Sequence, residues 1–270
     1  MFLKNLGRSI RLSLPRKLIC DLVHFAHKIP SVPVQKEVKL GDLEETRAKL
    51  AVRPSWAAIF TKGYARVAAE MPELRRAYLY FPWARLYEHP INVASVAVER
   101  DYQGEKGVFF AKITSPDLMT LADLDACLDQ HRTEPVEALA SFRTQMRITR
   151  LPKFLRRLAW WYVTAARGYR KANWLGTFGV SVYSSLGVES LHPLSPLTTT
   201  LNYGVIRDGV APVRIIYDHR ALDGAMVARA LNRLEEILNT EILSELAALP
   251  CKAASSSEPA ANRSGVETAC

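Results

Sequence analysis

The sequence predicts a single α/β domain in which a mixed sheet packs against helices. Segments with helical spacing and segments rich in β-branched and aromatic residues follow one another without regular alternation, and no internal repeat links them. The chain has 270 residues, of which 49% are apolar and 23% charged. These values are ordinary for a folded domain. No apolar run approaches the ~18 residues that a membrane-spanning helix requires.

Three helices are expected in the first half of the chain. Residues 41–51 read as a short helix that begins with Asp42, a capping-type residue. Residues 54–74 place large apolar side chains at helical spacing behind a Pro-Ser start signal. Residues 115–132 read as a third helix with Ser-Pro-Asp at its entrance.

The expected strands come in two hairpins and one single segment. Residues 91–100 and 107–113 are joined by a loop that contains glycine. Residues 197–206 and 210–219 are joined by Arg-Asp-Gly, a strong turn signal. Residues 176–184 have the β-branched and aromatic content of one further strand.

The chain is expected to end in a helix and a polar tail. Residues 223–249 place apolar side chains on one side of a long amphipathic helix. Residues 251–270 are small and polar, a composition typical of disorder. We therefore expect one domain at residues 1–250 and a disordered tail at 251–270.

The cysteines and the N-terminus favour a cytoplasmic protein. Cys20, Cys127, Cys251 and Cys270 are widely separated and lack the spacing of a zinc site or of a disulfide framework. The basic N-terminus has no continuous apolar core or cleavage site of a secretory signal, and an amphipathic targeting peptide stays open. We expect no bound metal.

The positive charge is concentrated in one segment. The formal net charge is +9, yet no Asp or Glu occurs from Ala138 to Val188. Nine cations fall in that interval, namely Arg143, Arg147, Arg150, Lys153, Arg156, Arg157, Arg167, Arg170 and Lys171. They match the entire excess, so the rest of the chain is nearly neutral. Nucleic acid is a poor fit, because no binding motif accompanies the charge.

The stretch "YDHRALDG", residues 217–224, joins the last predicted strand to the last helix. His219 closes the strand, and a neutral imidazole is well suited to removing a proton near pH 7. Asp223 stands where a carboxylate can cap a helix, and Gly224 permits a tight turn. The alternative is a half-buried histidine beside an ordinary helix cap, and the motif alone does not decide between them.

A resemblance adds to this interpretation. The stretch "YDHRALDGAMVARALNRLEEIL" resembles the signature of the dihydrolipoamide acyltransferase catalytic domain of 2-oxoacid dehydrogenases, a relative of chloramphenicol acetyltransferase. Segments similar to that family follow in the right order at residues 16–50, 56–78, 91–100 and 176–187. The resemblance implies a chloramphenicol acetyltransferase-like two-layer fold and a homotrimer whose active sites lie between subunits.

The resemblance also implies a set of site residues. It makes His219 the general base that deprotonates a thiol or hydroxyl acceptor, with coenzyme A as the acyl carrier. Asp223 becomes a structural carboxylate that pairs with Arg16. A serine would donate to the oxyanion, and two alignments select Ser181 or Ser184. Three residues apart on a strand, the two serines would face opposite sides, so only one can serve, and we prefer Ser181.

The chain departs from that family in two ways. Family members carry a lipoylated domain and a small partner-docking domain ahead of the catalytic part, whereas this chain begins almost at the catalytic part. We therefore expect a stand-alone acyltransferase, or a non-catalytic scaffold subunit that retains the fold. A basic insert at about 143–174 also replaces a short polar loop.

The insert predicts a basic amphipathic helix over residues 151–171. Leu151, Phe154, Leu155, Leu158, Tyr162, Ala165 and Tyr169 share one face, while Lys153, Arg157, Thr164, Arg167 and Lys171 share the other with Trp160. Three interpretations stay open. The helix packs on the protein's own core, lies on an anionic membrane surface or lipid-like acceptor, or attracts the phosphates of coenzyme A.

Overall fold

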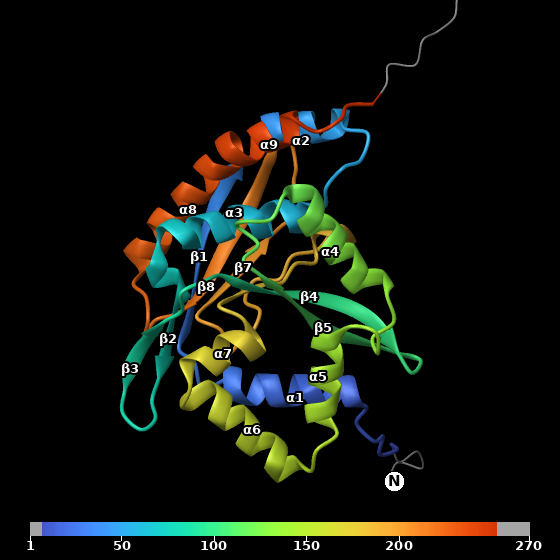
Figure 1. Cartoon of the computed structure of the whole chain (residues 1–270), viewed down its shortest axis with the longest axis vertical. Helices are drawn as coiled ribbons and strands as arrows, with labels where there is room; N and C mark the ends of the chain where they lie inside the picture. Colours follow the sequence, from blue (N-terminus) through green and yellow to red (C-terminus); the bar gives the residue numbers. More distant parts are fainter. Residues whose placement is uncertain (1–6, 253–270) are drawn as a thin grey trace, which may run out of the picture.

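The structure is a computed structural model, and it describes residues 7–252 apart from the side chain of Ser185. A six-stranded sheet with the order β1-β8-β7-β6-β4-β5 crosses its centre (Figure 1). Its strands are β1 (Ser31–Lys39), β4 (Val93–Tyr102), β5 (Glu105–Thr114), β6 (Phe178–Val180), β7 (Thr199–Tyr203) and β8 (Val210–Asp218). Strand β6 runs parallel to β4 and β7, and the other neighbours are antiparallel. The predicted mixed sheet is confirmed.

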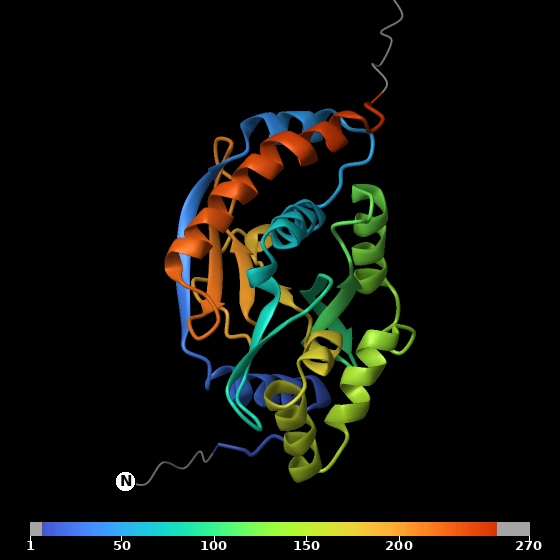
Figure 2. The ribbon, with the colours of Figure 1, turned by 60° about the vertical axis from the view of Figure 1, so that its left-hand side comes forward.

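Both predicted hairpins are present, and a third one appears. Strands β4 and β5 pair directly, as do β7 and β8. At the second turn Gly209 has φ of 70°, and a Cβ there would lie 2.9 Å from the Cα of Gly41. Glycine is required there by both conformation and space. The additional hairpin, β2 (Arg76–Leu79) with β3 (Arg85–Glu88), extends away from the main sheet (Figure 2).

Helices α3 (Trp56–Glu70) and α8 (Gly224–Ile237) cover one face of the sheet (Figure 1). Phe60 of α3 stacks on Tyr203 of β7, with ring centroids 4.1 Å apart. Helix α8 continues through a π-helical turn, Leu238–Ile242, into α9 (Leu243–Ala247), so the long predicted helix is confirmed. Helices α2 (Gly41–Lys49) and α4 (Leu121–Thr133) flank this layer.

Two helix starts differ from the prediction. Helix α2 begins at Gly41 with Leu40 at the N-cap, so Asp42 lies inside its first turn. Helix α4 begins at Leu121, because the Thr120 hydroxyl accepts a hydrogen bond from the backbone of Asp123 at 3.1 Å. That side chain satisfies an N-terminal amide of the helix, which therefore starts after the Ser-Pro-Asp that the sequence placed at its entrance.

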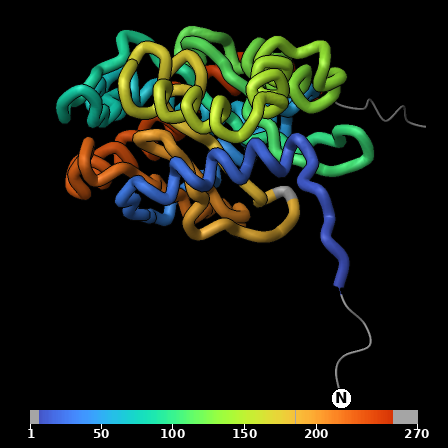
Figure 3. The backbone as a smooth tube through the Cα atoms, turned by 90° about the horizontal axis from the view of Figure 1, so that it is seen from below, coloured from blue at the N-terminus to red at the C-terminus, as the bar shows by residue number. Residues whose placement is uncertain are grey.

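The basic insert forms three helices beside the first helix of the chain. Helices α5 (Ala140–Thr149), α6 (Lys153–Ala165) and α7 (Gly168–Leu175) lie next to α1 (Leu14–Ala26), as Figure 3 shows from below. The single helix expected over residues 151–171 is therefore wrong. A Cβ on Gly168 would come within 2.2 Å of the Tyr87 ring on β3, so this position approaches the hairpin too closely for a larger residue.

The described ends of the chain leave part of the tail untested. Cys251 forms an isolated bridge with Leu50, so the described chain keeps its order slightly past the predicted boundary. Residues 253–270, including Cys270, lie outside the described residues. Cys20, Cys127 and Cys251 are free thiols. None of the helices within residues 7–252 is both long and apolar enough to cross a membrane.

Candidate active site

The corner after β8 presents an exposed imidazole. His219 directly follows the last residue of β8, and its backbone N–H donates to the carbonyl of Pro30 at 3.1 Å. Its side chain is exposed, and its ring centroid lies 5.5 Å from that of Tyr217. The backbone of the histidine is thus held by the start of β1, while its ring remains free to meet a substrate.

An ion pair between a buried carboxylate and an exposed guanidinium fixes the shape of this corner. Asp218 is only 1% exposed, and its carboxylate accepts hydrogen bonds from Arg220 Nε at 2.9 Å and Nη2 at 2.8 Å. The backbone N–H of Arg220 donates to the same carboxylate at 3.0 Å. The guanidinium lies 4.5 Å from the ring centroid of Tyr78 on β2. A buried carboxylate that accepts several hydrogen bonds in this way holds the loop in one geometry.

The sequence analysis missed this pair and assigned the structural carboxylate to Asp223. The signal was present as Asp-His-Arg inside the motif, but the spacing of two residues does not by itself show that the two side chains pair. Tyr78 gave no signal, because it meets Arg220 only through the fold. Another missed group is His192, whose Nε2 lies 2.8 Å from the Ser31 hydroxyl, and Ser31 pairs with Asp218 in the sheet.

Asp223 and Arg16 do not meet within the chain. Asp223 occupies the N-cap position of α8, yet its exposed side chain makes no capping hydrogen bond. Arg16 is exposed in the first turn of α1, and no ion pair joins the two in the described part of the chain. Their joint role stays a prediction. Gly224 has ordinary backbone geometry, and a Cβ there would lie 3.3 Å from the Tyr217 hydroxyl.

The two candidate serines have different surroundings. Strand β6 ends at Val180, so Ser181 follows the strand and Ser184 opens a short 3-10 turn. The expected argument from opposite strand faces therefore does not apply. Ser181 lines a groove, whereas Ser184 hydrogen-bonds Tyr203 and so opposes the rise in that tyrosine's pKa that burial causes. This difference favours Ser181 as a side chain that can reach a substrate.

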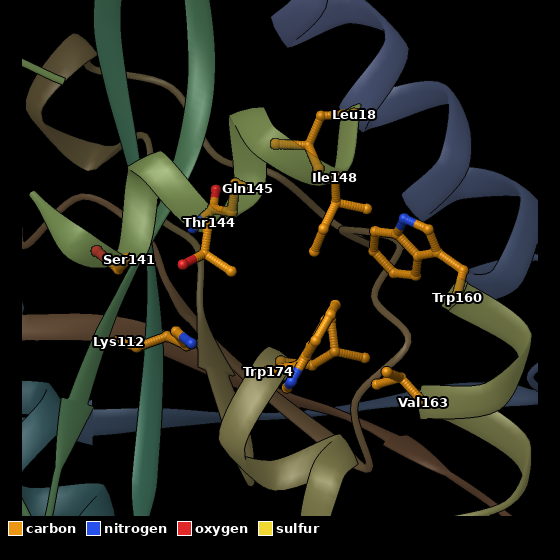
Figure 4. A pocket seen from close by; sticks show the side chains of 10 residues that line it. Leu18, Lys112, Ser141, Thr144, Gln145, Ile148, Trp160, Val163 and Trp174 are labelled. Atoms are coloured by element: carbon orange, nitrogen blue, oxygen red, sulfur yellow. The ribbon is translucent and has the colours of Figure 1, made fainter. Parts of the chain in front are cut away.

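The groove beside Ser181 has a volume of about 450 Å³ and runs between α1, the β4–β5 hairpin and the loop before β7. Arg16, Leu22 and Phe110 contribute to its walls. Smaller apolar hollows continue from it toward the insert and share lining residues with it. A further narrow hollow of about 40 Å³ lies among α1, α5, α6 and α7 (Figure 4). The side chains that turn toward it are mostly apolar and include Leu18, Ile148, Trp160, Val163 and Trp174.

One chain does not bring Ser181 and His219 together. The backbone N–H of Ser181 donates to Leu201, and the next residue of β7, Asn202, pairs with Arg214 of β8. His219 lies five residues further along β8, which corresponds to about 17 Å at the rise of a strand. The serine therefore lies level with the middle of β8, whereas the histidine lies just past the end of that strand.

A buried lysine stands behind the corner. Lys171 of α7 is 4% exposed, and burial lowers its pKa to about 8. The Asp218 carboxylate opposes this decrease in pKa, while Arg220 adds to it. Within residues 7–252, no three His, Cys, Asp or Glu side chains gather to hold a metal ion.

Comparison with known proteins identifies the fold. No family model matches the chain, and no curated protein matches its sequence. A probable dihydrolipoamide acetyltransferase from Listeria monocytogenes is similar with a TM-score of 0.63 and 18% identity, covering 86% of this chain and 94% of that one. The Azotobacter vinelandii dihydrolipoamide acetyltransferase is similar with a TM-score of 0.62 and 20% identity, covering 90% and 95%.

A third solved structure agrees with these two. The truncated catalytic core of the 2-oxoacid dehydrogenase complex from Thermoplasma acidophilum has a TM-score of 0.60 and 15% identity, covering 87% of this chain and 99% of that one. At such identities the likeness establishes the fold. The α/β fold that the sequence resemblance implied, a mixed sheet packed against helices, is confirmed.

Proposed function

We propose that this chain is a coenzyme A-dependent acyltransferase that moves an acyl group between coenzyme A and a thiol or hydroxyl acceptor. The observation that carries the proposal is the exposed ring of His219 at a corner held rigid by Asp218 and Arg220. It occurs in a fold shared with dihydrolipoamide acetyltransferase cores.

The proposed reaction uses His219 as the general base. The neutral imidazole accepts the proton of the acceptor thiol or hydroxyl, and the freed electron pair forms a bond to the thioester carbonyl carbon. The carbonyl π pair moves onto oxygen, and the Ser181 hydroxyl donates a hydrogen bond to that oxyanion. When the tetrahedral intermediate collapses, the carbon–sulfur bond breaks and the coenzyme A thiolate takes the proton from the imidazolium.

We propose that two chains of a homotrimer build each site. Ser181 and His219 lie about 17 Å apart along the strand direction, too far to act on one carbonyl within one chain. A neighbour in the fold comparison is the cubic core of a pyruvate dehydrogenase multienzyme complex. A trimer places one chain's serine against another chain's histidine if the groove of one faces the corner of the next.

The solved Azotobacter vinelandii structure supports the residue choice. That study addresses a serine, a histidine and an asparagine in the catalytic mechanism, with the asparagine four positions after the histidine. His219 and Asp223 have the same separation here. We propose that Asp223 positions the site, either through Arg16 of an adjoining copy or through another cation.

A non-catalytic assembly subunit is the second candidate. Asp223, whose side chain makes no capping hydrogen bond at α8, would then have no role in a site between copies of the chain. Such a subunit would keep the fold and the trimer but would release no coenzyme A from acyl-coenzyme A in the presence of an acceptor.

Mass spectrometry of acceptors incubated with acyl-coenzyme A mixtures tests the proposal. We expect acylated thiol or hydroxyl acceptors with wild-type protein, and at least a hundredfold slower transfer with His219→Ala, the usual contribution of positioned proton transfer being about 10²–10⁴-fold. His24→Ala is the matched control, because this exposed imidazole lies on α1 beside Arg157 of α6. Equal turnover by the His219 variant would remove that residue from the mechanism, and no transfer by wild type would favour the assembly subunit.

A further inference from the structure

The outer side of α6 is apolar and faces solvent. Phe154 is 71% exposed and Leu158 58%, and Leu155 and Tyr162 on the same side are also exposed. This is the face that the first interpretation of the insert placed against the protein's own core, and that interpretation is wrong for these side chains. Exposing so many large apolar groups together marks an interaction surface.

The inner side of α6 is already occupied, so the exposed face cannot turn inward. Trp160 stacks on Phe25 of α1 with ring centroids 5.7 Å apart. Arg156 is 8% exposed and pairs with the fully buried Asp21 of α1. Rotating the helix would break this buried pair and leave a charge without a partner, which is strongly unfavourable.

The β2–β3 hairpin adds its tip to the same surface. The backbone N–H of Phe81 donates to Ala165 at 3.2 Å, and its ring centroid lies 5.2 Å from that of Trp161. Phe81 is 46% exposed and Trp83 is 67% exposed. Figure 2 shows the hairpin reaching down to the helices of the insert. Segments about 70 positions apart in the chain thus form one patch, which we call the apolar patch: Phe81, Trp83, Phe154, Leu155, Leu158 and Tyr162.

Uncompensated cations surround the apolar patch. Lys153, Arg167 and Arg170 are exposed, and none of them has a carboxylate partner among residues 7–252. The Arg170 guanidinium lies 5.9 Å from the Tyr162 ring centroid. The nearby acid, Asp21, is buried and already bound to Arg156 and Arg157. The surface therefore combines apolar and aromatic groups with a net positive rim.

We propose that the apolar patch docks this protein onto an anionic lipid bilayer, with α6 lying in the plane of the interface. Aliphatic and aromatic side chains enter the boundary between headgroups and acyl chains, while the arginines and lysine remain with the negative headgroups. A symmetric contact with a second copy is disfavoured, because it would bring two positive rims together. The proposal is independent of the acyl transfer proposed above.

Vesicle sedimentation of the full chain tests the proposal. We expect binding to phosphatidylcholine vesicles to rise about tenfold or more when about 30 mol% phosphatidylserine is added, and to weaken in high salt. Phe154→Ser with Leu158→Ser should reduce binding about tenfold or more, because two large apolar groups no longer enter the interface. These side chains are exposed, so the fold should be retained, and circular dichroism checks it.

Matched variants separate the contributions. Val52→Ser with Leu118→Ser removes two apolar side chains that are 78% and 79% exposed elsewhere, and binding should not change. Lys153→Gln with Arg167→Gln and Arg170→Gln should abolish the preference for anionic vesicles. Equal binding to neutral and anionic vesicles, or an unaffected Phe154/Leu158 variant, would overturn the proposal. The proposal would also be overturned if wild type did not bind vesicles and the Phe154/Leu158 variant had a smaller oligomeric state than wild type in sedimentation velocity. The apolar patch would then join copies of the chain.

Discussion

Two buried aspartates orient two different surfaces of this molecule. Asp218, which is 1% exposed, binds Arg220 two residues later and fixes the loop that presents His219. Asp21, which is fully buried, binds Arg156, which is 135 positions away, and fixes the rotation of α6. In both places a carboxylate without access to water holds a guanidinium.

The two ion pairs differ in the kind of surface that each one holds in place. The short-range pair holds an imidazole in a polar corner, a group that can move a proton. The long-range pair holds an amphipathic helix with its apolar side outward, a surface that can only associate. Losing the Asp21 pair should cost more stability than losing the Asp218 pair. A buried Arg156 left without its partner costs about 3–5 kcal/mol, whereas Arg220 is exposed to water. Only one loss should disturb acyl transfer.

The largest expected effect comes from mixing two inactive variants of the chain. Ser181→Ala and His219→Ala should each lower transfer about a hundredfold or more. If sites form between chains, unfolding and refolding the two together restores activity to about a quarter of wild type, since one interface in four then joins an intact serine to an intact histidine. The rate of coenzyme A release measures it.

Refolding each variant alone is the control for that experiment. A mixture that stays as inactive as its components, although it forms mixed trimers by native mass spectrometry, would contradict a site shared between chains. That result would also contradict the proposal that the corner after β8 faces the groove of another copy.

A smaller effect is expected from replacing Asp218 and Asp21 one at a time, and it distinguishes the roles of the two aspartates. We expect Asp21→Asn to lower the free energy of unfolding by about 3–5 kcal/mol, because it leaves the buried Arg156 unpaired. Asp218→Asn should lower it less, because Arg220 is exposed to water. Asp218→Asn should also lower kcat about tenfold to a hundredfold by loosening the corner. Asp21→Asn should leave kcat within about twofold while it weakens vesicle binding. Urea unfolding and transfer assays on both variants provide the measurements.

Two outcomes with these variants would contradict the separate roles assigned to Asp218 and Asp21. If Asp21→Asn slows transfer as much as Asp218→Asn does, the insert and the corner act as one unit and the division of roles is wrong. If neither variant changes kcat, the ion pair beside His219 contributes stability alone.

Sequence patterns predicted the main elements because those elements bury a regular face. The spacing of Phe60 and Tyr64 follows a helix that packs on the sheet, and Arg-Asp-Gly requires a turn at Gly209. Helix starts were predicted less well. At α4 the N-cap residue is Thr120 and not Ser115, which lies five residues earlier. Both residue types are good N-caps, so residue type alone does not decide which one starts the helix.

The site and the insert show why the rest could not be predicted. Apolar periodicity indicates that α6 has two unlike sides, but it does not say which side meets the protein. Here a remote partner, Asp21, draws Arg156 inward and leaves Phe154 outside. The distance between Ser181 and His219 likewise depends on how β6 pairs with β7, and no tight turn joins these two strands to set their register.

The smallest expected effect concerns Lys171, which the insert places behind the corner. Burial lowers its folded-state pKa to about 8, whereas the pKa of a lysine in the unfolded chain is near its ordinary value of 10.5. Between these values the unfolded chain binds more protons than the folded chain, so this lysine makes stability rise as pH increases from about 8 to 10.5. Below pH 8 it is charged while buried, and it lowers stability.

Lys171→Met should therefore raise the free energy of unfolding at pH 7 by about 1–3 kcal/mol, and this gain should fade toward pH 10.5. Urea unfolding of both proteins at several pH values measures the difference, and subtracting the two curves cancels the tyrosines that titrate in the same range. A gain that is constant with pH would mean that the lysine is held charged by Asp218. The insert would then be tied to the corner at His219 by an ion pair, and the two regions could no longer be treated as separate.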